Sequence, residues 1–357
     1  MAVVVFLAIL ALLILVHEFG HFLAAKKNGV LVEEFGIGFP PRLFGIKKGD
    51  TLYSINALPI GGFVKVYGEE YHEEETKPVD RRLRDRAFVY KKPWQKAVII
   101  ASGIVGNFLL AWVLISFLFT QGVPTPTNNV IVERVQSGSP ADKAGLLPQD
   151  VVTKIILNTK TYQISSSSDL IKLSRDFAGR SITLVYIRNK VEKTAILVPR
   201  KEPPQGQGPL GVVITSFVEK KYPWFQAPFF GLAHSFAITY RIVVELSKTL
   251  FQLMTLQKPS VDVAGPIGIA QFTSQAIKFG KNAVLELTAL LSLNLAVINI
   301  FPFPALDGGR LLFVLYEWTT KKRINKRFER YANLFGMIVL LTLAFIISIN
   351  DIVRLSR

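Results

Sequence analysis

The chain contains 357 residues, of which 50% are hydrophobic, and its mean hydropathy is +0.35. This value lies well above that of an ordinary soluble enzyme and excludes a set of purely soluble domains. The formal net charge is +16, but the basic residues gather between apolar runs, which argues against a nucleic-acid-binding module. Cysteine is absent, so disulfides, a cysteine nucleophile and a zinc–thiolate site are excluded.

Four apolar runs have the length of about 20 residues that crosses a hydrocarbon core. The first lacks the basic start and small-residue cleavage site of a signal peptide, so we expect it to remain in the mature protein. Another, Val284 to Phe303, carries one charge, Glu286, near its start. Each run is predicted to be a transmembrane helix, at 1–25, 97–120, 281–303 and 331–350.

Lysine and arginine are concentrated in two connecting segments, 26–96 and 304–330. The positive-inside rule predicts that both segments are cytoplasmic, the second as a loop. Residues 31–66 alternate like strands around a turn at 48–50, and the charge-dense stretch 69–86 is interpreted as a solvated linker. Residues from 121 to about 280 are then expected on the outer side.

The outer part opens with a linker rich in Pro, Thr and Asn and continues as short alternating strands with one short helix. This pattern predicts a small mixed α and β domain. The strands are expected at 130–135, 151–156 and 181–187, the helix at 168–177, and the whole domain at 121–217.

The stretch 226–256 is apolar enough to be mistaken for a further span. Its polar residues recur every three to seven positions on one helical face, a pattern that is typical of a helix lying on a membrane surface. We therefore expect an interfacial amphipathic helix and a loop at 218–280. The polar face consists of His234, Arg241, Glu245, Lys248 and Gln252.

Two histidines four residues apart, with a glutamate after the first, occur near the end of the first run, at His17, Glu18 and His21. Four residues make about one helical turn, so both imidazoles project from one face and can share a tetrahedral zinc ion. Glu18 then stands beside a zinc-activated water and can act as general base in peptide hydrolysis. Ionisable groups in an apolar run are costly, which makes a capping role the weaker interpretation.

A catalytic zinc site needs a third protein ligand and one position open to water. The other two histidines, His72 and His234, lie outside the predicted spans. Asp307 follows a proline-containing break at 302–304, where the third helix must end. Because the first and third spans run in the same direction, Asp307 and His21 both fall at cytoplasmic ends and can meet. The sequence therefore predicts His17, His21 and Asp307 as zinc ligands.

These residues resemble the site-2 protease family of intramembrane zinc metalloproteases, in its bacterial branch of RseP type. The resemblance covers nearly the whole chain. It departs from the family at 102–107, which keeps a glycine and Asn107 but lacks the usual proline. It rests on His17 to His21, four spans, an outer domain between the second and third spans, and the motif Asn299, Pro302, Leu306, Asp307, Gly308.

The resemblance implies substrate contacts for Asn299, Pro302, Asn107 and Gly62. For Asn299, a satisfied polar residue in helix packing remains an equal alternative. The resemblance also implies a membrane re-entrant β-hairpin at about 33–66, whose edge could receive an extended substrate strand.

The outer domain is implied to be a PDZ domain, since 138–146 resembles the start of that fold and 208–211 resembles its carboxylate-binding loop. The ligand of this PDZ domain is not indicated. The expected fold is an α-helical polytopic membrane protein with four transmembrane helices, a membrane-associated β-hairpin and an inserted extracytoplasmic α+β PDZ domain.

Expected partners are the lipid bilayer and single-span membrane proteins, such as anti-sigma factors or signal peptide remnants, and no nucleic acid. The expected location is the bacterial inner membrane, with the active site near the cytoplasmic face. The outer domain and the interfacial helix would act as a gate that admits trimmed substrates.

Three other interpretations compete with the protease. A non-catalytic PDZ scaffold with a structural metal site would have no use for Glu18. A metalloprotease with a glutamate as third ligand would need a downstream helix with paired glutamates, and none is evident. A transporter would be expected to carry inverted repeats, and none is recognisable.

Overall fold

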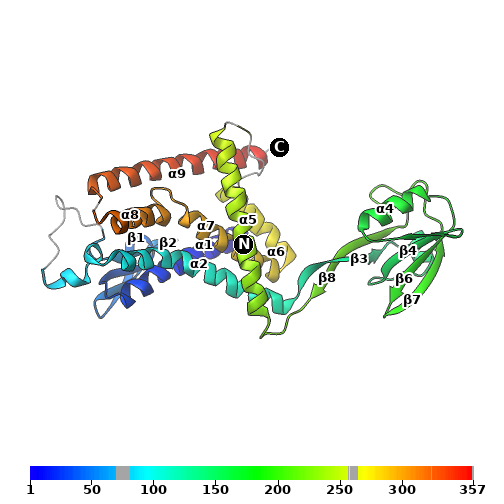
Figure 1. Ribbon diagram of the computed structural model, residues 1–357, viewed down its shortest axis with the longest axis horizontal. Helices are drawn as coiled ribbons and strands as arrows, with labels where there is room; N and C mark the ends of the chain where they lie inside the picture. The colour runs from blue at the N-terminus through cyan, green and yellow to red at the C-terminus, as the bar shows by residue number, and fades with distance from the viewer. Residues whose placement is uncertain (70–80, 256, 258–263, 323, 356–357) are drawn as a thin grey trace. The chain divides into compact units, whose positions relative to one another are not determined.

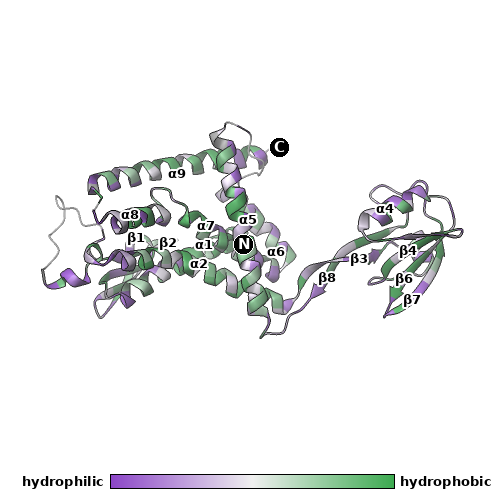
Figure 2. Cartoon of the chain, in the orientation of Figure 1, coloured by the Kyte–Doolittle hydropathy of each residue, from purple (hydrophilic) through white to green (hydrophobic). Residues whose placement is uncertain are grey.

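The computed structural model describes residues 1–69, 81–255, 257, 264–322 and 324–355. The chain forms two compact units (Figure 1). The smaller unit is Gln121–Tyr222, whereas the outer domain was expected at 121–217. The larger unit combines Met1–Thr120 with Pro223–Arg357 and contains the long apolar helices, which appear green in Figure 2.

All four predicted spans are helical. They correspond to α1 (Ala2–Lys27), α2 (Pro93–Gln121), α7 (Lys281–Ile300) and α9 (Lys326–Leu355). Among the described residues a fifth helix, α5 (Ala227–Met254), is also long and apolar enough to cross a membrane by length and composition. Within the larger unit, α5 runs steeply across the direction of α2 and α9 (Figure 1).

The structure differs from two of the expectations for the connecting segments. The segment 218–280 holds a second helix, α6 (Pro266–Phe279), which starts with proline in its first turn and ends at Gly280. The expected loop 304–330 is wrong, because it contains α8 (Asp307–Thr320). Gly308 and Gly309 form the first turn of α8, where backbone carbonyls of residues 300, 301 and 303 approach too closely for any side chain.

The hairpin is present as β1 (Val32–Lys48) and β2 (Thr51–Val66), joined at Gly49 with φ +62°. The first part of β1 pairs on both of its sides, since Gly36 aligns with Phe63 and also with Ser54. Residues 62–66 therefore form one edge of this sheet. The sheet packs against α1, where the Phe22 ring lies 5.1 Å from Phe35.

A buried cluster joins the elements that surround this packing. It includes Ala25 of α1, Val32 of β1, Ile100 of α2 and Val314 of α8. Two short 3-10 helices, η1 (Arg81–Arg86) and η2 (Phe88–Tyr90), precede α2. Most of the charge-dense stretch 69–86, including His72, lies outside the described residues.

The smaller unit is an antiparallel sheet in the order β7-β6-β4-β3-β8, with β5 paired to β4. The predicted strands and helix fall within β3, β4, β6 and α4. Its core includes Ile155, Leu170 and Leu184, each at most 1% exposed. The elements are β3 (Val123–Val135), α3 (Pro140–Lys143), β4 (Val151–Leu157), β5 (Lys160–Gln163), α4 (Ser167–Asp176), β6 (Ile182–Arg188), β7 (Val191–Leu197) and β8 (Val212–Lys220).

Candidate metal centre

The two histidines of α1 face each other across one helical turn. Their Nε2 atoms are 3.1 Å apart and the ring planes are nearly perpendicular, with centroids 4.7 Å apart. This follows from their spacing, because residues i and i+4 of a helix lie one above the other on the same face. Both Nε2 atoms are therefore available to one shared partner.

Asp307, the first residue of α8, brings a carboxylate to the same point. Its Oδ2 atom lies 3.0 Å from His17 Nε2 and 3.4 Å from His21 Nε2. The loop 301–306 turns sharply to achieve this, with Ala305 at φ +73°. Gly308 and Gly309 let α8 start directly against the loop carbonyls.

Three ligand atoms, from His17, His21 and Asp307, thus lie within 4.8 Å of one another. A tetrahedral zinc ion bound at ~2.0–2.1 Å would set its ligand atoms about 3.3 Å apart, close to the observed separations. Asp307 Oδ2 is buried, yet within the described part of the chain its geometry gives it no hydrogen-bond partner. Buried polar atoms are nearly always paired, so this orphan oxygen fits a missing cation.

Each imidazole is held on its far side by a second group. His21 Nδ1 lies 2.8 Å from the carbonyl oxygen of Ile99, so Nδ1 carries the proton and Nε2 is left free. His17 Nδ1 lies 3.3 Å from the amide of Asn107, whose Oδ1 is a second buried orphan within the described residues. Exchanging the amide oxygen and nitrogen would let His17 Nδ1 donate to Oδ1 and leave its Nε2 free as well.

Close approach of α1 and α2 depends on glycine. A Cβ atom at Gly103 would lie 2.8 Å from His17 Nε2 and would overlap His21 as well. A Cβ atom at Gly20 of α1 would overlap the carbonyl oxygen of Ser102, and one at Gly106 would lie 2.9 Å from the carbonyl oxygen of Val16. The glycine-containing stretch of the second span therefore serves to bring α2 against the two imidazoles.

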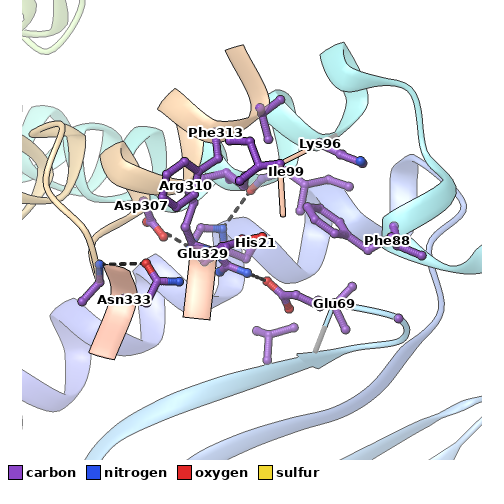
Figure 3. Close-up of a pocket in the computed structure, with 18 of the residues that line it drawn as sticks. His21, Glu69, Phe88, Lys96, Ile99, Asp307, Arg310, Phe313, Glu329 and Asn333 are labelled. Atoms are coloured by element: carbon purple, nitrogen blue, oxygen red, sulfur yellow. Dashed lines mark hydrogen bonds and ion pairs between the residues drawn. The ribbon is translucent and has the colours of Figure 1, made fainter. Parts of the chain in front are cut away.

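A cavity of about 620 Å³ opens beside this cluster and is lined by His17, Glu18, His21 and Asp307 (Figure 3). Two ion pairs are formed by residues that line this cavity. Arg310 of α8 pairs with Glu69 at the end of the hairpin, and Lys96 of α2 pairs with Glu317 of α8 at 2.8 Å. A second cavity of about 240 Å³ has Ile14, Leu295 and Leu306 among its lining residues. Glu18 lines both cavities.

The remaining predicted residues take different positions. Asn299 Nδ2 lies 3.5 Å from His17 Nε2 and lines the second cavity. A Cβ atom at Gly62 would lie 3.8 Å from Glu18 Cγ, so the sheet edge passes beside the cluster. Asn107 is fully buried against His17, and Pro302 is exposed on the loop. The ion pairs of Arg310 and Lys96 were not predicted, because nothing in the sequence links partners 241 and 221 residues apart.

Comparison with known proteins identifies the family of the chain. The sequence pattern of peptidase family M50 matches residues 5–343. The chain belongs to peptidase family M50. A relative from Clostridium acetobutylicum, named provisionally as a zinc metalloprotease, is 32% identical over 97% of this chain and 96% of its own length.

Other relatives carry similar names and are matched over nearly their whole length. Zinc metalloprotease RasP of Bacillus licheniformis is 29% identical over 99% of each chain. A Nostoc protein, also provisionally named a zinc metalloprotease, is 31% identical over 100% of this chain and 97% of its own. Among solved structures, the PDZ domain of an SdrC-like protein from Listeria monocytogenes matches with 20% identity and a TM-score of 0.21, covering 26% of this chain and 94% of that domain.

Proposed function

We propose that this M50 peptidase is a zinc metalloprotease that hydrolyses peptide bonds within or near transmembrane segments of other proteins. The observation that carries the proposal is the convergence of His17, His21 and Asp307 on a point that lies next to Glu18 and faces a cavity. The names of the relatives favour zinc as the metal. The apolar helix α1, which carries His17 and His21, favours a site within the bilayer.

The donor set fits zinc. Two imidazole nitrogens and one carboxylate oxygen are the ligands of many hydrolytic zinc sites, which keep a fourth position for water. His17, His21 and Asp307 would hold the ion, and the orphan Oδ2 atom would gain its partner. Ile99 and Asn107 would keep the two imidazoles in the tautomer that leaves Nε2 free.

The proton transfers of the reaction fall to a residue of the chain itself. Zinc, when bound, polarises a peptide carbonyl and lowers the pKa of water. Glu18 lies next to His17 in the chain and lines both cavities, so it is positioned to accept the proton of the attacking water and deliver it to the leaving amine.

A peptide bond inside a helix is protected by its hydrogen bonds, so the substrate must be extended before it is cut. The edge formed by residues 62–66 is suited to hold it, because strand pairing supplies backbone hydrogen bonds in any sequence. Gly62 lies beside Glu18 on this edge. Asn299, in the second cavity, and Pro302, on the adjoining loop, would contact the same strand.

We further propose that four helices span the membrane and that α5 lies along its surface. The steep crossing of α5 over α2 and α9 supports this arrangement (Figure 1). The basic segments 26–96 and 304–330 would be cytoplasmic, in a bacterial inner membrane. The hairpin would enter the bilayer, since Leu43 and Phe44 of β1 are 70% and 57% exposed.

The unit Gln121–Tyr222 would be an extracytoplasmic PDZ domain. Its small antiparallel sheet with α4 beside β8 supports that assignment. It would act with α5 as a gate for single-span substrates, such as anti-sigma factors or signal peptide remnants, whose bulky outer parts have been removed.

The test compares purified wild type with Glu18→Gln for cleavage of single-span reporter substrates and for zinc content. We expect about one zinc per chain in both proteins and a rate at least ~100-fold lower in the variant. Glu245→Gln on α5 is the matched control, and we expect it to cleave at the wild-type rate. If both proteins hold zinc and neither cleaves any reporter, a non-catalytic scaffold with a structural metal becomes the better account.

A further inference from the structure

The last helix, α9, is buried against the rest of the larger unit at two separated places. Among its residues of known burial only Gly336 and Asp351 are buried. Between them the helix presents large apolar side chains such as Leu341 and Phe345, which are 65% and 67% exposed. These side chains suit a lipid environment, whereas the two buried positions need separate explanations.

The first place is the loop that carries the metal ligand. Asn333 Oδ1 accepts a hydrogen bond of 3.2 Å from the backbone N–H of Ala305, two residues before Asp307 (Figure 3). One turn further along α9, Gly336 lies so close to the carbonyl of Pro304 that a Cβ atom would overlap it. Ala305 has φ +73°, a conformation that is unfavourable for alanine and needs support from its surroundings.

The second place is the start of α6. Asp351 Oδ2 accepts a hydrogen bond of 2.8 Å from the backbone N–H of Gly268. The N-cap residue of α6 is Gly265, which has no side chain to cap the free N–H groups, so Asp351 supplies the cap from another helix. Its negative charge also complements the positive end of the α6 dipole.

The two places lie on one face of α9. Asn333 and Asp351 are separated by about five helical turns, or roughly 27 Å along the axis. A straight helix fixed at both points holds them at a constant separation. The position of the loop 304–305 is therefore tied to the position of α6.

We propose that α9 is a strut that positions the metal ligand Asp307, with Asn333 as its positioning residue and Asp351 as its anchor on α6. This inference rests on the proposed function, because it takes Asp307 as a ligand. Loss of the Asn333 acceptor leaves the Ala305 N–H unpaired and lets the strained loop relax. Asp307 then moves away from the two imidazoles and the metal is held less tightly.

The first experiment measures zinc affinity of the full-length purified protein by competition with a chelator. Asn333→Leu, which removes the acceptor, is expected to weaken zinc binding by about 10-fold and lower kcat, with KM changed less than about 2-fold. Asn333→Asp keeps an acceptor oxygen and is expected to restore affinity to within about 2-fold. Asn294→Leu is the matched control, because its amide donates within its own helix.

Wild-type affinity in Asn333→Leu, or equal loss in the leucine and aspartate variants, would overturn the positioning role. A protein that does not fold is recognised by its thermal unfolding, and Asn333→Ser then replaces Asn333→Leu. If Asp307→Ala also keeps wild-type affinity, the proposed ligand set fails. If Asp307→Ala loses zinc while Asn333→Leu does not, only the strut fails.

The second experiment tests the connection along the helix. Asp351→Leu alone is expected to weaken zinc binding by about 3-fold, and Asp351→Asn by less than 2-fold, since the amide keeps an acceptor. Distant substitutions normally add in free energy. If α9 acts as a strut, the double variant Asp351→Leu/Asn333→Leu should instead bind zinc no more weakly than Asn333→Leu alone. If the losses of zinc-binding free energy in the two single variants add fully in the double variant, α6 and the loop 304–305 are independent.

Discussion

Two carboxylates, one in each compact unit, have opposite surroundings. Asp150 of the smaller unit accepts hydrogen bonds of 2.7 and 2.6 Å from Arg188 and one of 2.8 Å from the backbone of Leu147. It raises the pKa of the Arg188 guanidinium by hydrogen bonding. Asp307 of the larger unit faces two imidazoles, and within the described residues its Oδ2 atom has no hydrogen-bond partner.

The difference separates a structural carboxylate from a functional one. A carboxylate whose oxygens are already paired stabilises the fold and has little capacity left for a ligand. One whose oxygen is buried, unpaired and next to free imidazole nitrogens costs stability until a cation arrives. The same substitution at the two positions should therefore have opposite consequences.

The largest effect is expected for Asp307→Ala. Loss of one of three ligands should weaken zinc binding at least ~100-fold and abolish measurable cleavage. The metal-free protein should be no less stable than metal-free wild type, because the substitution removes an unpaired buried charge. Chelator competition and thermal unfolding measure the two quantities. A metal-free variant that unfolds well below metal-free wild type would assign Asp307 a structural role.

Asp150→Ala should show the reverse pattern. Breaking a buried ion pair leaves Arg188 unpaired and should destabilise the smaller unit by about 3 kcal/mol. Hydrogen exchange of the full-length protein reports this as faster exchange within 121–222, while zinc affinity stays at the wild-type value. Glu192→Gln, on an exposed position of β7, is the control. Loss of zinc in Asp150→Ala would contradict the separation of roles.

Gly103→Ala tests how closely the metal centre is packed. The added Cβ atom would displace both imidazoles, so zinc affinity should fall by about 10-fold. Gly208→Ala, where a Cβ atom would meet open space, is the matched control and should leave affinity unchanged. Equal affinities of the two variants would mean that α1 and α2 can separate without cost to the site.

The smallest effect concerns the pH dependence of the smaller unit. Hydrogen bonds from the Ser166 side chain and from the backbone N–H of Ser165 lower the pKa of Asp169, at the start of α4. Its folded pKa is depressed, so its contribution to stability is present above the unfolded value of about 3.9 and is lost as pH falls through the folded pKa.

Asp169→Asn should therefore lower protection of α4 amides in hydrogen exchange at pH 7. The difference from wild type should shrink when protection is compared below pH 4. A difference that is unchanged across this range would exclude ionisation of Asp169 as its cause.

Much of the site followed from local sequence rules. Hydropathy predicted α1, which carries two of the three candidate ligands, and the four-residue spacing predicted that His17 and His21 share a face. Asp307 was predicted from the helix break before it together with the common direction of two spans. The start of α8 at Asp307 was missed, because two adjacent glycines favour a turn unless close backbone packing requires them.

Other features could not be predicted because they depend on contacts between distant segments. The Lys96–Glu317 pair and the Asn333 hydrogen bond join residues whose proximity no periodicity indicates. The same holds for α6, since the residue that caps it, Asp351, lies in α9. The double pairing of β1, which sets the sheet edge beside Glu18, also arises only when the hairpin folds back on itself.

The most direct test of the central claim is X-ray absorption at the zinc edge on the purified protein. We expect four light scatterers at about 2.0–2.1 Å, two of them imidazoles. Asp307→Ala should lose zinc or show an altered shell with both imidazoles retained, and His17→Ala should lose one imidazole. A zinc shell that is the same in wild type and both variants would show that the metal is held elsewhere, and would contradict the proposed centre.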